Sequence, residues 1–166
     1  MALSVCNAVI NPSFETGNLS PWTASAVNVA KISNGTSAYD GDYYLNLQTA
    51  YGNRGNTISQ HLKHLTPRSE YDFNVKVQVP SPGGVEYCSV YVYMGKNATI
   101  GKIASANIFN FGEWETLTGT YKAKRPQETL NIIAACDSED SSVTGNVWID
   151  DISFDGPGNC KTKSDE

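Results

Sequence analysis

Hydrophobic and polar positions alternate with a period of two residues along most of this chain. The clearest stretch is 70–79, in which every second residue is apolar: Tyr71, Phe73, Val75, Val77 and Val79. Such alternation is typical of a β-strand with one buried and one solvent-exposed face. The pattern predicts about nine strands, over residues 4–10, 27–32, 43–48, 58–62, 70–79, 85–94, 114–121, 129–136 and 147–154, with a short apolar piece near 103–111.

The spacing of these strands indicates the fold class. Gly, Pro, Asn and Ser separate the short runs, and we find no convincing helix and no internal repeat. No apolar run approaches the roughly 20 residues that a membrane helix needs, so we expect no membrane partner. We therefore expect residues 1–166 to form a single all-β domain, a two-sheet antiparallel β-sandwich of the jelly-roll, galactose-binding-like type.

The stretch 147–154 places two carboxylates among apolar and aromatic residues. Strict alternation would put Trp148, Asp150, Ile152 and Phe154 on one side of this strand. Burial of an ionised Asp is costly unless hydrogen bonds or a cation compensate its charge. We therefore expect this strand to contribute both to the core and to an ion site.

Composition and short motifs favour a secreted protein. The formal net charge of −5 argues against nucleic-acid binding, which usually needs a basic face. Asn-x-Ser/Thr glycosylation sequons begin at Asn18, Asn34 and Asn97, although such short motifs also arise by chance. We expect Met1-Ala2 to mark a start placed where a signal peptide has been removed.

The four cysteines lack CxxC spacing, which favours two disulfides over a zinc site. Of the three possible pairings, we favour Cys6 with Cys160 and Cys88 with Cys136. The first two lie just outside the first and last predicted strands. The other two occupy the expected core sides of their strands.

A stripe of tyrosines suggests a ligand surface. If the strand 85–94 buries Cys88, Val90, Val92 and Met94, its other side presents Tyr87, Tyr91 and Tyr93. Sugars need aromatic planes for their C–H faces and polar groups for their hydroxyls, and tyrosine offers both. Neighbouring strands would complete a polar cleft, provided that they belong to the same sheet, with Tyr44, Asn46, Gln48, Asn74, Lys76 and Gln78. Tyrosines are also simply good strand formers.

Four motifs in order resemble the jelly-roll carbohydrate-binding modules of the family 4, 9 and 22 type. They are Asn11-Pro-Ser-Phe-Glu-Thr-Gly17 with Trp22, Tyr39-Asp-Gly-Asp-Tyr-Tyr-Leu, Leu65-Thr-Pro-Arg-Ser-Glu-Tyr-Asp-Phe, and Val147-Trp-Ile-Asp-Asp-Ile-Ser-Phe. Arg68 stands where these modules usually have Gly. The resemblance implies a non-catalytic module that recognises a cell-wall or surface polysaccharide or oligosaccharide.

The same resemblance implies a structural Ca²⁺ that ties the N-terminal loop to the last strand. Carried over to this sequence, the side-chain ligands would be Glu15 and Asp150, with Asp40 less certain and Gly41 contributing its carbonyl. Without the resemblance, these acidic residues would read as surface charges or turn caps.

Two other functions stay open. A glycosidase needs two carboxylates across a cleft, and the pairs Glu113 with Glu115 and Glu139 with Asp140 are merely neighbours in sequence. His61 and His64 are expected on opposite sides of a strand, so a shared metal site is not indicated. A cell-surface adhesion or structural β-sandwich that binds a protein, or no glycan, is the other alternative. We expect the carbohydrate-binding module itself to be a monomer.

Overall fold

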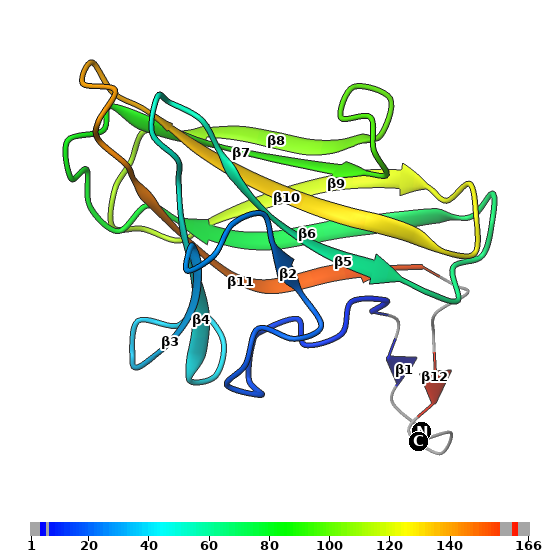
Figure 1. Ribbon diagram of the computed structural model, residues 1–166. Helices are drawn as coiled ribbons and strands as arrows, with labels where there is room; N and C mark the ends of the chain where they lie inside the picture. The colour runs from blue at the N-terminus through cyan, green and yellow to red at the C-terminus, as the bar shows by residue number, and fades with distance from the viewer. Residues whose placement is uncertain (1–3, 6, 157–160, 163–166) are drawn as a thin grey trace.

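The computed structural model describes residues 4–5, 7–156 and 161–162, which form twelve strands and no helix. Ten of these strands form two five-stranded antiparallel sheets that pack face to face (Figure 1). The predicted all-β jelly-roll sandwich is confirmed. Within the described residues, no helix long and apolar enough to cross a membrane is found.

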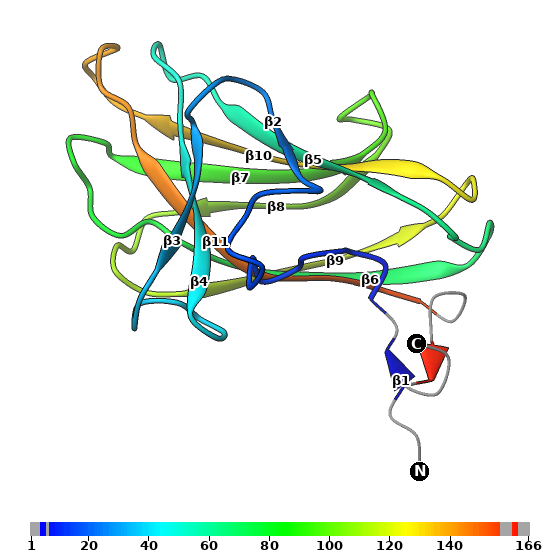
Figure 2. The same ribbon diagram turned by 60° about the horizontal axis from the view of Figure 1, so that its bottom comes forward.

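Sheet I forms the upper layer in Figure 2. Its strands, in spatial order, are β2 (Thr23–Ala24), β5 (Asn56–Leu62), β10 (Glu128–Asp137), β7 (Tyr87–Met94) and β8 (Lys102–Ile108).

Sheet II forms the other layer. Its strands, in spatial order, are β3 (Ala30–Asn34), β4 (Tyr43–Gln48), β11 (Asn146–Asp155), β6 (Glu70–Gln78) and β9 (Glu115–Lys122). A separate two-stranded ribbon of β1 (Ser4–Val5) and β12 (Lys161–Thr162) projects from the sandwich (Figure 2).

The core lies between the two sheets and is built by the alternating residues of the long strands. On β7, Cys88, Val90, Val92 and Met94 are buried while the residues between them are half-buried, as predicted. Aromatic side chains fill the core where strands meet loops, because their area gives a large hydrophobic gain on burial. Tyr71 of β6, for example, stacks on Phe154 of β11 with ring centroids 4.7 Å apart.

A disulfide joins the two central strands of sheet I. Cys88 and Cys136 lie directly opposite each other on β7 and β10, with their Cα atoms 3.9 Å apart, and are bonded as predicted. The predicted pair Cys6 with Cys160 lies outside the described residues. Gly145 packs against Cys136, and a Cβ atom there would collide with the sulfur. A residue without a side chain is therefore required beside the bond.

The last long strand departs from strict alternation. The pairing of β11 with β6 shifts between Asp150 and Ser153, which is a β-bulge, and Asp151 has a φ of 50°. The extra residue reverses the side to which later residues point. The prediction that Trp148 shares a side with Ile152 is therefore wrong, because Trp148 points outward while Ile152 is buried in the core.

Two predicted strands differ from those observed. Within 4–10, the strand β1 ends at Val5, and Asn7 then forms an isolated bridge with Asp155. Within 27–32, Val27 is 85% exposed and strand β3 begins only at Ala30. The cause is local, because Asn28 has a φ of 63°, which interrupts an extended strand.

Arg68, which stands where the third motif usually has Gly, adopts a backbone conformation that suits glycine. Arg68 has a φ of 70°, in the left-handed region that glycine enters at the least cost. Its amide donates to the carbonyl of Ala123 at 2.8 Å, which helps to hold the turn before β6. The turn is therefore kept in this chain despite the substitution.

Candidate functional site

The nine residues predicted to line a saccharide cleft lie on two opposite outer faces of the sandwich. Tyr87, Tyr91 and Tyr93 project from β7 of sheet I, whereas the other six project from β4 and β6 of sheet II. The required condition, that all these strands share a sheet, is not met, so the nine do not form one cleft. Alternation identifies the outward side of a strand but not the sheet to which the strand belongs.

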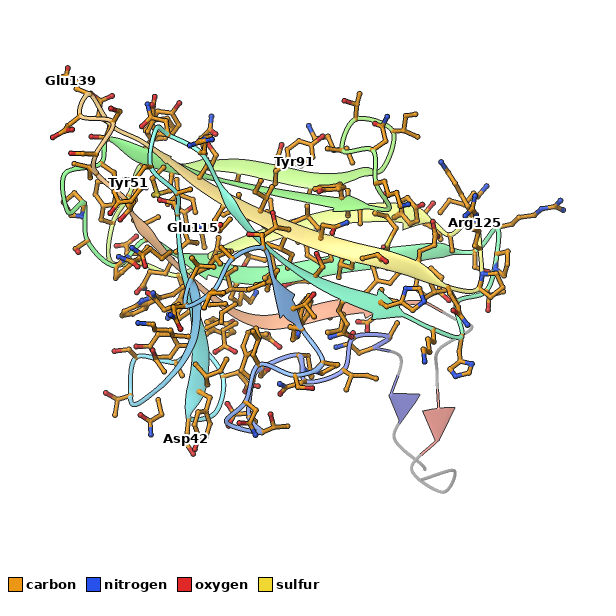
Figure 3. The ribbon with its side chains drawn as sticks, viewed as in Figure 1. Asp42, Tyr51, Tyr91, Glu115, Arg125 and Glu139 are labelled. Carbon is orange, nitrogen blue, oxygen red and sulfur yellow. A yellow bond between two sulfur atoms is a disulfide. The ribbon has the colours of Figure 1, made fainter. Side chains whose placement is uncertain are left out.

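We call the outer side of sheet I around β7 the tyrosine face. Tyr91 lies near its centre and is labelled in Figure 3. Its ring centroid is 6.1 Å from that of Tyr93, and its hydroxyl donates to the carbonyl of Ala98 at 2.7 Å. The Lys102 ammonium lies 5.5 Å from the centre of the Tyr91 ring. These contacts restrict the ring and leave it half-buried.

Polar side chains border the tyrosines on both neighbouring strands. Tyr91 lies opposite Ser105 of β8, and Tyr93 lies opposite Asn131 of β10. Two residue pairs before Tyr91 and Ser105, the Ser89 hydroxyl donates to the Asn107 side-chain carbonyl at 2.8 Å. The exposed hydroxyl and amide of Ser105 and Asn107 therefore flank the rings, an arrangement that can bind the hydroxyls and C–H faces of a sugar, whereas Asn131 is buried and bonded within the protein.

The tyrosine face ends in a second aromatic pair. Tyr87 and Phe109 have ring centroids 5.0 Å apart, and Phe109 is 62% exposed. The charge of Asp137, and a hydrogen bond between this carboxylate and the phenol, raise the pKa of Tyr87. Asn107 and Phe109 were missed at the sequence level, although the polar alternation in the short piece near 103–111 was a usable signal.

At its other end the tyrosine face opens into a pocket of about 830 Å³. Tyr93 and Asn131 line it together with the 95–101 loop, which includes Asn97, and with residues of the β9–β10 turn. His61 also lines this pocket, and its Nε2 lies 3.0 Å from the Gln127 carbonyl oxygen. The face and pocket together could hold several sugar rings in a row.

The outer side of sheet II carries a different set of rings, which we call the aromatic cluster: Tyr39, Tyr44, Trp114 and Trp148. Tyr44 and Trp148 are closest, with centroids 4.6 Å apart, and the Trp148 indole N–H donates to the side-chain oxygen Oδ1 of Asn46 at 3.0 Å. Tyr39, Trp114 and Trp148 were not predicted as ligand residues. Tyr39 comes from a loop, where strand periodicity gives no signal.

The residues predicted to bind calcium meet around the 39–43 turn. Asp150 is fully buried, and its carboxylate accepts from the amides of Tyr39 and Asp40, each at 3.0 Å. Burial raises the pKa of Asp150 to about 6, with a smaller contribution from the charge of Asp40 and an opposing effect of the amide hydrogen bonds. No cation among the described residues pairs with this carboxylate.

Glu15 lies against the same turn. Its carboxylate accepts from the amides of Asp42, at 3.1 and 3.2 Å, and of Tyr43, at 3.0 Å. A Cβ atom on Gly41 would collide with this carboxylate, and the φ of Gly41 is 63°. Glycine therefore allows Glu15 to close over the turn.

These oxygens fit a hard cation in chemistry, because Ca²⁺ prefers carboxylate and carbonyl ligands. Asp150 is buried beside Asp40, and its negative charge is compensated by backbone amides and not by a cation among the described residues. The two carboxylates are nevertheless occupied by backbone amides, and no group of three or more His, Cys, Asp or Glu placed to hold a metal is found in the described part of the chain. An ion would therefore depend partly on backbone carbonyls.

Comparison with known proteins identifies the class of this domain. The family model described as a carbohydrate binding domain matches residues 6–139, and the chain belongs to this family. No curated protein matches the sequence.

Solved structures share the fold at low sequence identity. A family 61 module in complex with β-1,4-galactotriose is 18% identical, with a TM-score of 0.64, and the match covers 90% of this chain and 98% of that one. A xylan-binding domain of family 22 is also 18% identical, with a TM-score of 0.62 and coverage of 92% and 96%. A Clostridium thermocellum xylanase fragment complexed with xylohexaose is 18% identical with a TM-score of 0.62, and the match covers 92% of this chain but 29% of the fragment.

Proposed function

We propose that this domain is a non-catalytic module that binds a β-linked oligosaccharide or polysaccharide on the tyrosine face. The observation that carries the proposal is the half-buried row of Tyr87, Tyr91 and Tyr93, flanked on β8 by exposed hydroxyl and amide side chains. Membership of the carbohydrate-binding family supports it, as do the similar folds that hold β-1,4-galactotriose and xylohexaose.

The charge of the face supports binding without hydrolysis. Glycosidases usually place two carboxylates on either side of the scissile bond. Among the outward side chains of β5, β7, β8 and β10, Asp137 supplies the carboxylate, and it lies beside Tyr87 at one end. Glu128 lines the pocket at the other end, where its carboxylate accepts from the Tyr121 hydroxyl and the Lys124 amide. The two pairs of neighbouring acids lie elsewhere. Glu113, Glu139 and Asp140 are on loops, and Glu115 is at the start of β9.

Calcium is part of the proposal as a structural ion. Glu15 and Asp150 would hold it through their carboxylates, with Asp40 and the Gly41 carbonyl as further oxygen donors. When bound, the ion would supply the positive charge that the buried Asp150 lacks. The convergence of both carboxylates on one turn supports this assignment.

We also place the protein outside the cell as a monomer. The Cys88–Cys136 disulfide is of the kind that persists in oxidising compartments, and the sequon residues Asn18, Asn34 and Asn97 are exposed.

The test is binding of soluble oligosaccharides, followed by calorimetry together with product analysis. A glycan array selects the ligand, and the β-1,4-linked galacto- and xylo-oligosaccharides are the first probes. Binding without shorter products is expected. Release of shorter sugars would instead indicate an enzyme, and no binding to any glycan would indicate an adhesion or structural domain.

A further inference from the structure

A groove of about 570 Å³ lies on the outer face of sheet II, on the opposite side of the sandwich from the tyrosine face. We call it the sheet II groove. Its volume lies within the range of roughly 300–1,000 Å³ that is common for small-ligand sites. Its floor is made of polar side chains from three adjacent strands, among them Asn74, Lys76, Thr118, Thr120 and Ser153.

One wall of the groove is an aromatic ring held in place from behind. Tyr39 is 49% exposed and lines the groove, while its ring meets Trp114 edge-on at a centroid distance of 6.0 Å. Trp114 in turn packs against Trp148 at 6.2 Å and donates its indole N–H to the Ser37 carbonyl at 3.1 Å. The rest of the aromatic cluster therefore supports a ring that faces solvent.

A fixed cation lies over the same ring. The Lys76 ammonium is 5.1 Å from the centre of the Tyr39 ring and donates to the Thr116 hydroxyl at 2.7 Å. Lys76 is therefore held between a strand neighbour and the groove wall. It covers part of the Tyr39 ring, so a ligand in the groove would contact the exposed remainder of the ring beside this hydrogen-bond donor.

The other polar groups select against anions. Asp72, Asp151 and Asp155 line the groove together, and burial with the charges of the other two raises the pKa of Asp155. Their oxygens repel negative ligands and accept hydrogen bonds from hydroxyl groups. Asn74 and the threonine hydroxyls can both donate and accept. An uncharged polyhydroxylated ligand with an apolar face suits this lining and the Tyr39 ring.

We propose that the sheet II groove is a second saccharide-binding site, which takes a neutral sugar segment against Tyr39. It rests on the proposed function, since it assumes that the domain binds glycans, but it assigns a surface separate from the tyrosine face. Because the two faces point in opposite directions, one molecule could bind two separate chains. Simultaneous contacts of this kind strengthen attachment to an insoluble polysaccharide without tighter individual sites.

The tryptophans allow the two sites to be distinguished. Trp22 lies in the core at 3% exposure, whereas Trp114 and Trp148 belong to the aromatic cluster behind the groove wall. Titration with xylohexaose or β-1,4-galactotriose should therefore change tryptophan fluorescence when the sheet II groove is filled. Binding confined to the tyrosine face should leave this signal nearly constant.

The decisive variants block one face at a time. Asn74→Arg places a long side chain in the groove, beside three carboxylates, without replacing any ring of the aromatic cluster. Ser81→Arg adds the same charge at an exposed loop position that lines neither pocket and is the matched control. Tyr91→Ala disables the tyrosine face. Unchanged melting temperatures establish that each variant is folded.

The expected result is that Tyr91→Ala retains a fluorescence response to saccharide, and that adding Asn74→Arg weakens this response at least tenfold while Ser81→Arg does not. If Tyr91→Ala abolishes all binding and Asn74→Arg leaves wild-type stoichiometry, the second site is wrong and the proposed function stands. If Asn74→Arg alone abolishes binding, the groove is supported and the tyrosine face is wrong. If the wild type binds no saccharide, both proposals fail.

Discussion

The two outer faces of the sandwich reach a similar chemistry by different structural means. On the tyrosine face, the three tyrosines project from one strand, so a period of two places Tyr87, Tyr91 and Tyr93 in one row, even though the pairing of β7 with β8 shifts between Val92 and Tyr93. In the sheet II groove, the exposed ring comes from a loop and Asp151 comes from a bulge. The first surface follows from strand geometry, whereas the second requires several irregular segments to be folded correctly.

The faces also differ in charge. Asp137 lies at one end of the tyrosine face, while three carboxylates and Lys76 share the sheet II groove. The groove should therefore discriminate more strongly against charged sugars than the tyrosine face does. It should also depend more on the state of the 39–43 turn, because Tyr39 belongs to that turn.

The largest expected effect concerns the disulfide beneath the tyrosine face. Cys88 and Cys136 are separated by 48 residues, and the loop-entropy relation assigns such a bond about 4 kcal/mol, less any native-state strain. The double variant Cys88→Ala with Cys136→Ala should therefore lower the free energy of unfolding by about 2–4 kcal/mol in urea titrations. Amide exchange should rise more in β7 and β10 than in β6 and β9, and equal increases in both sheets would contradict a local role.

Calcium should act mainly on the other sheet. If Ca²⁺ binds only the native state, a free Ca²⁺ concentration a hundredfold above the Kd would stabilise the protein by about 3 kcal/mol. Excess EDTA should therefore lower the melting temperature, and restored Ca²⁺ should raise it again. Glu15→Gln should remove this response, whereas Glu113→Gln, an exposed loop substitution, should preserve it. Identical melting curves with and without metal, after verified removal, would eliminate the ion site.

On the tyrosine face, Tyr91→Ala should weaken saccharide binding by roughly 1–3 kcal/mol, because central aromatic anchors have effects of this size. Calorimetry measures the change. Tyr91→Phe is the matched variant, since it keeps the ring and loses only the hydrogen bond to Ala98. It should bind much more tightly than Tyr91→Ala. Equal affinity of Tyr91→Ala and wild type would move the site away from this ring.

The smallest effect is a pH dependence in the groove. The pKa of Asp155 is raised by burial and by the charges of Asp72 and Asp151. The stability that this carboxyl contributes is therefore fully present below its ordinary pKa of about 4. It is lost as the pH rises through the raised pKa. Asp155→Asn cannot ionise and should melt slightly higher than wild type near neutral pH, with the difference disappearing in acid. Glu139→Gln, at an exposed loop position, is the control. A constant difference at every pH would exclude this explanation.

Much of the fold followed from local pattern. The inward positions of Cys88 and Cys136 favoured this pair among the three possible pairings, and the bond forms because β7 and β10 are adjacent and place the two residues opposite each other. The convergence of Glu15 and Asp150 on the 39–43 turn also agrees with the arrangement that the family resemblance implied.

The site could be predicted only in part, for reasons of geometry. Periodicity within a strand carries no information on its partner, so Asn74 and Tyr91 could be assigned to the outer side of a sheet but not to different sheets. The place of Tyr39 depends on its contact with Trp114, which lies 75 positions away in sequence (114 − 39 = 75). Such contacts form only when distant segments pack.

The bulge in β11 determines which side of the sheet the later residues of this strand face. One added residue separates a half in which Trp148 points outward from a half in which Ile152 points inward. The adjacent residues Asp150 and Asp151 consequently have different surroundings. Asp150 is buried under the 39–43 turn, and Asp151 lines the sheet II groove. Deletion of Asp151 would leave Asp150 pointing outward and Ile152 pointing inward by plain alternation, and would remove one carboxylate from the sheet II groove. The extra residue therefore adds a polar group to the groove without changing the side on which the core residues lie.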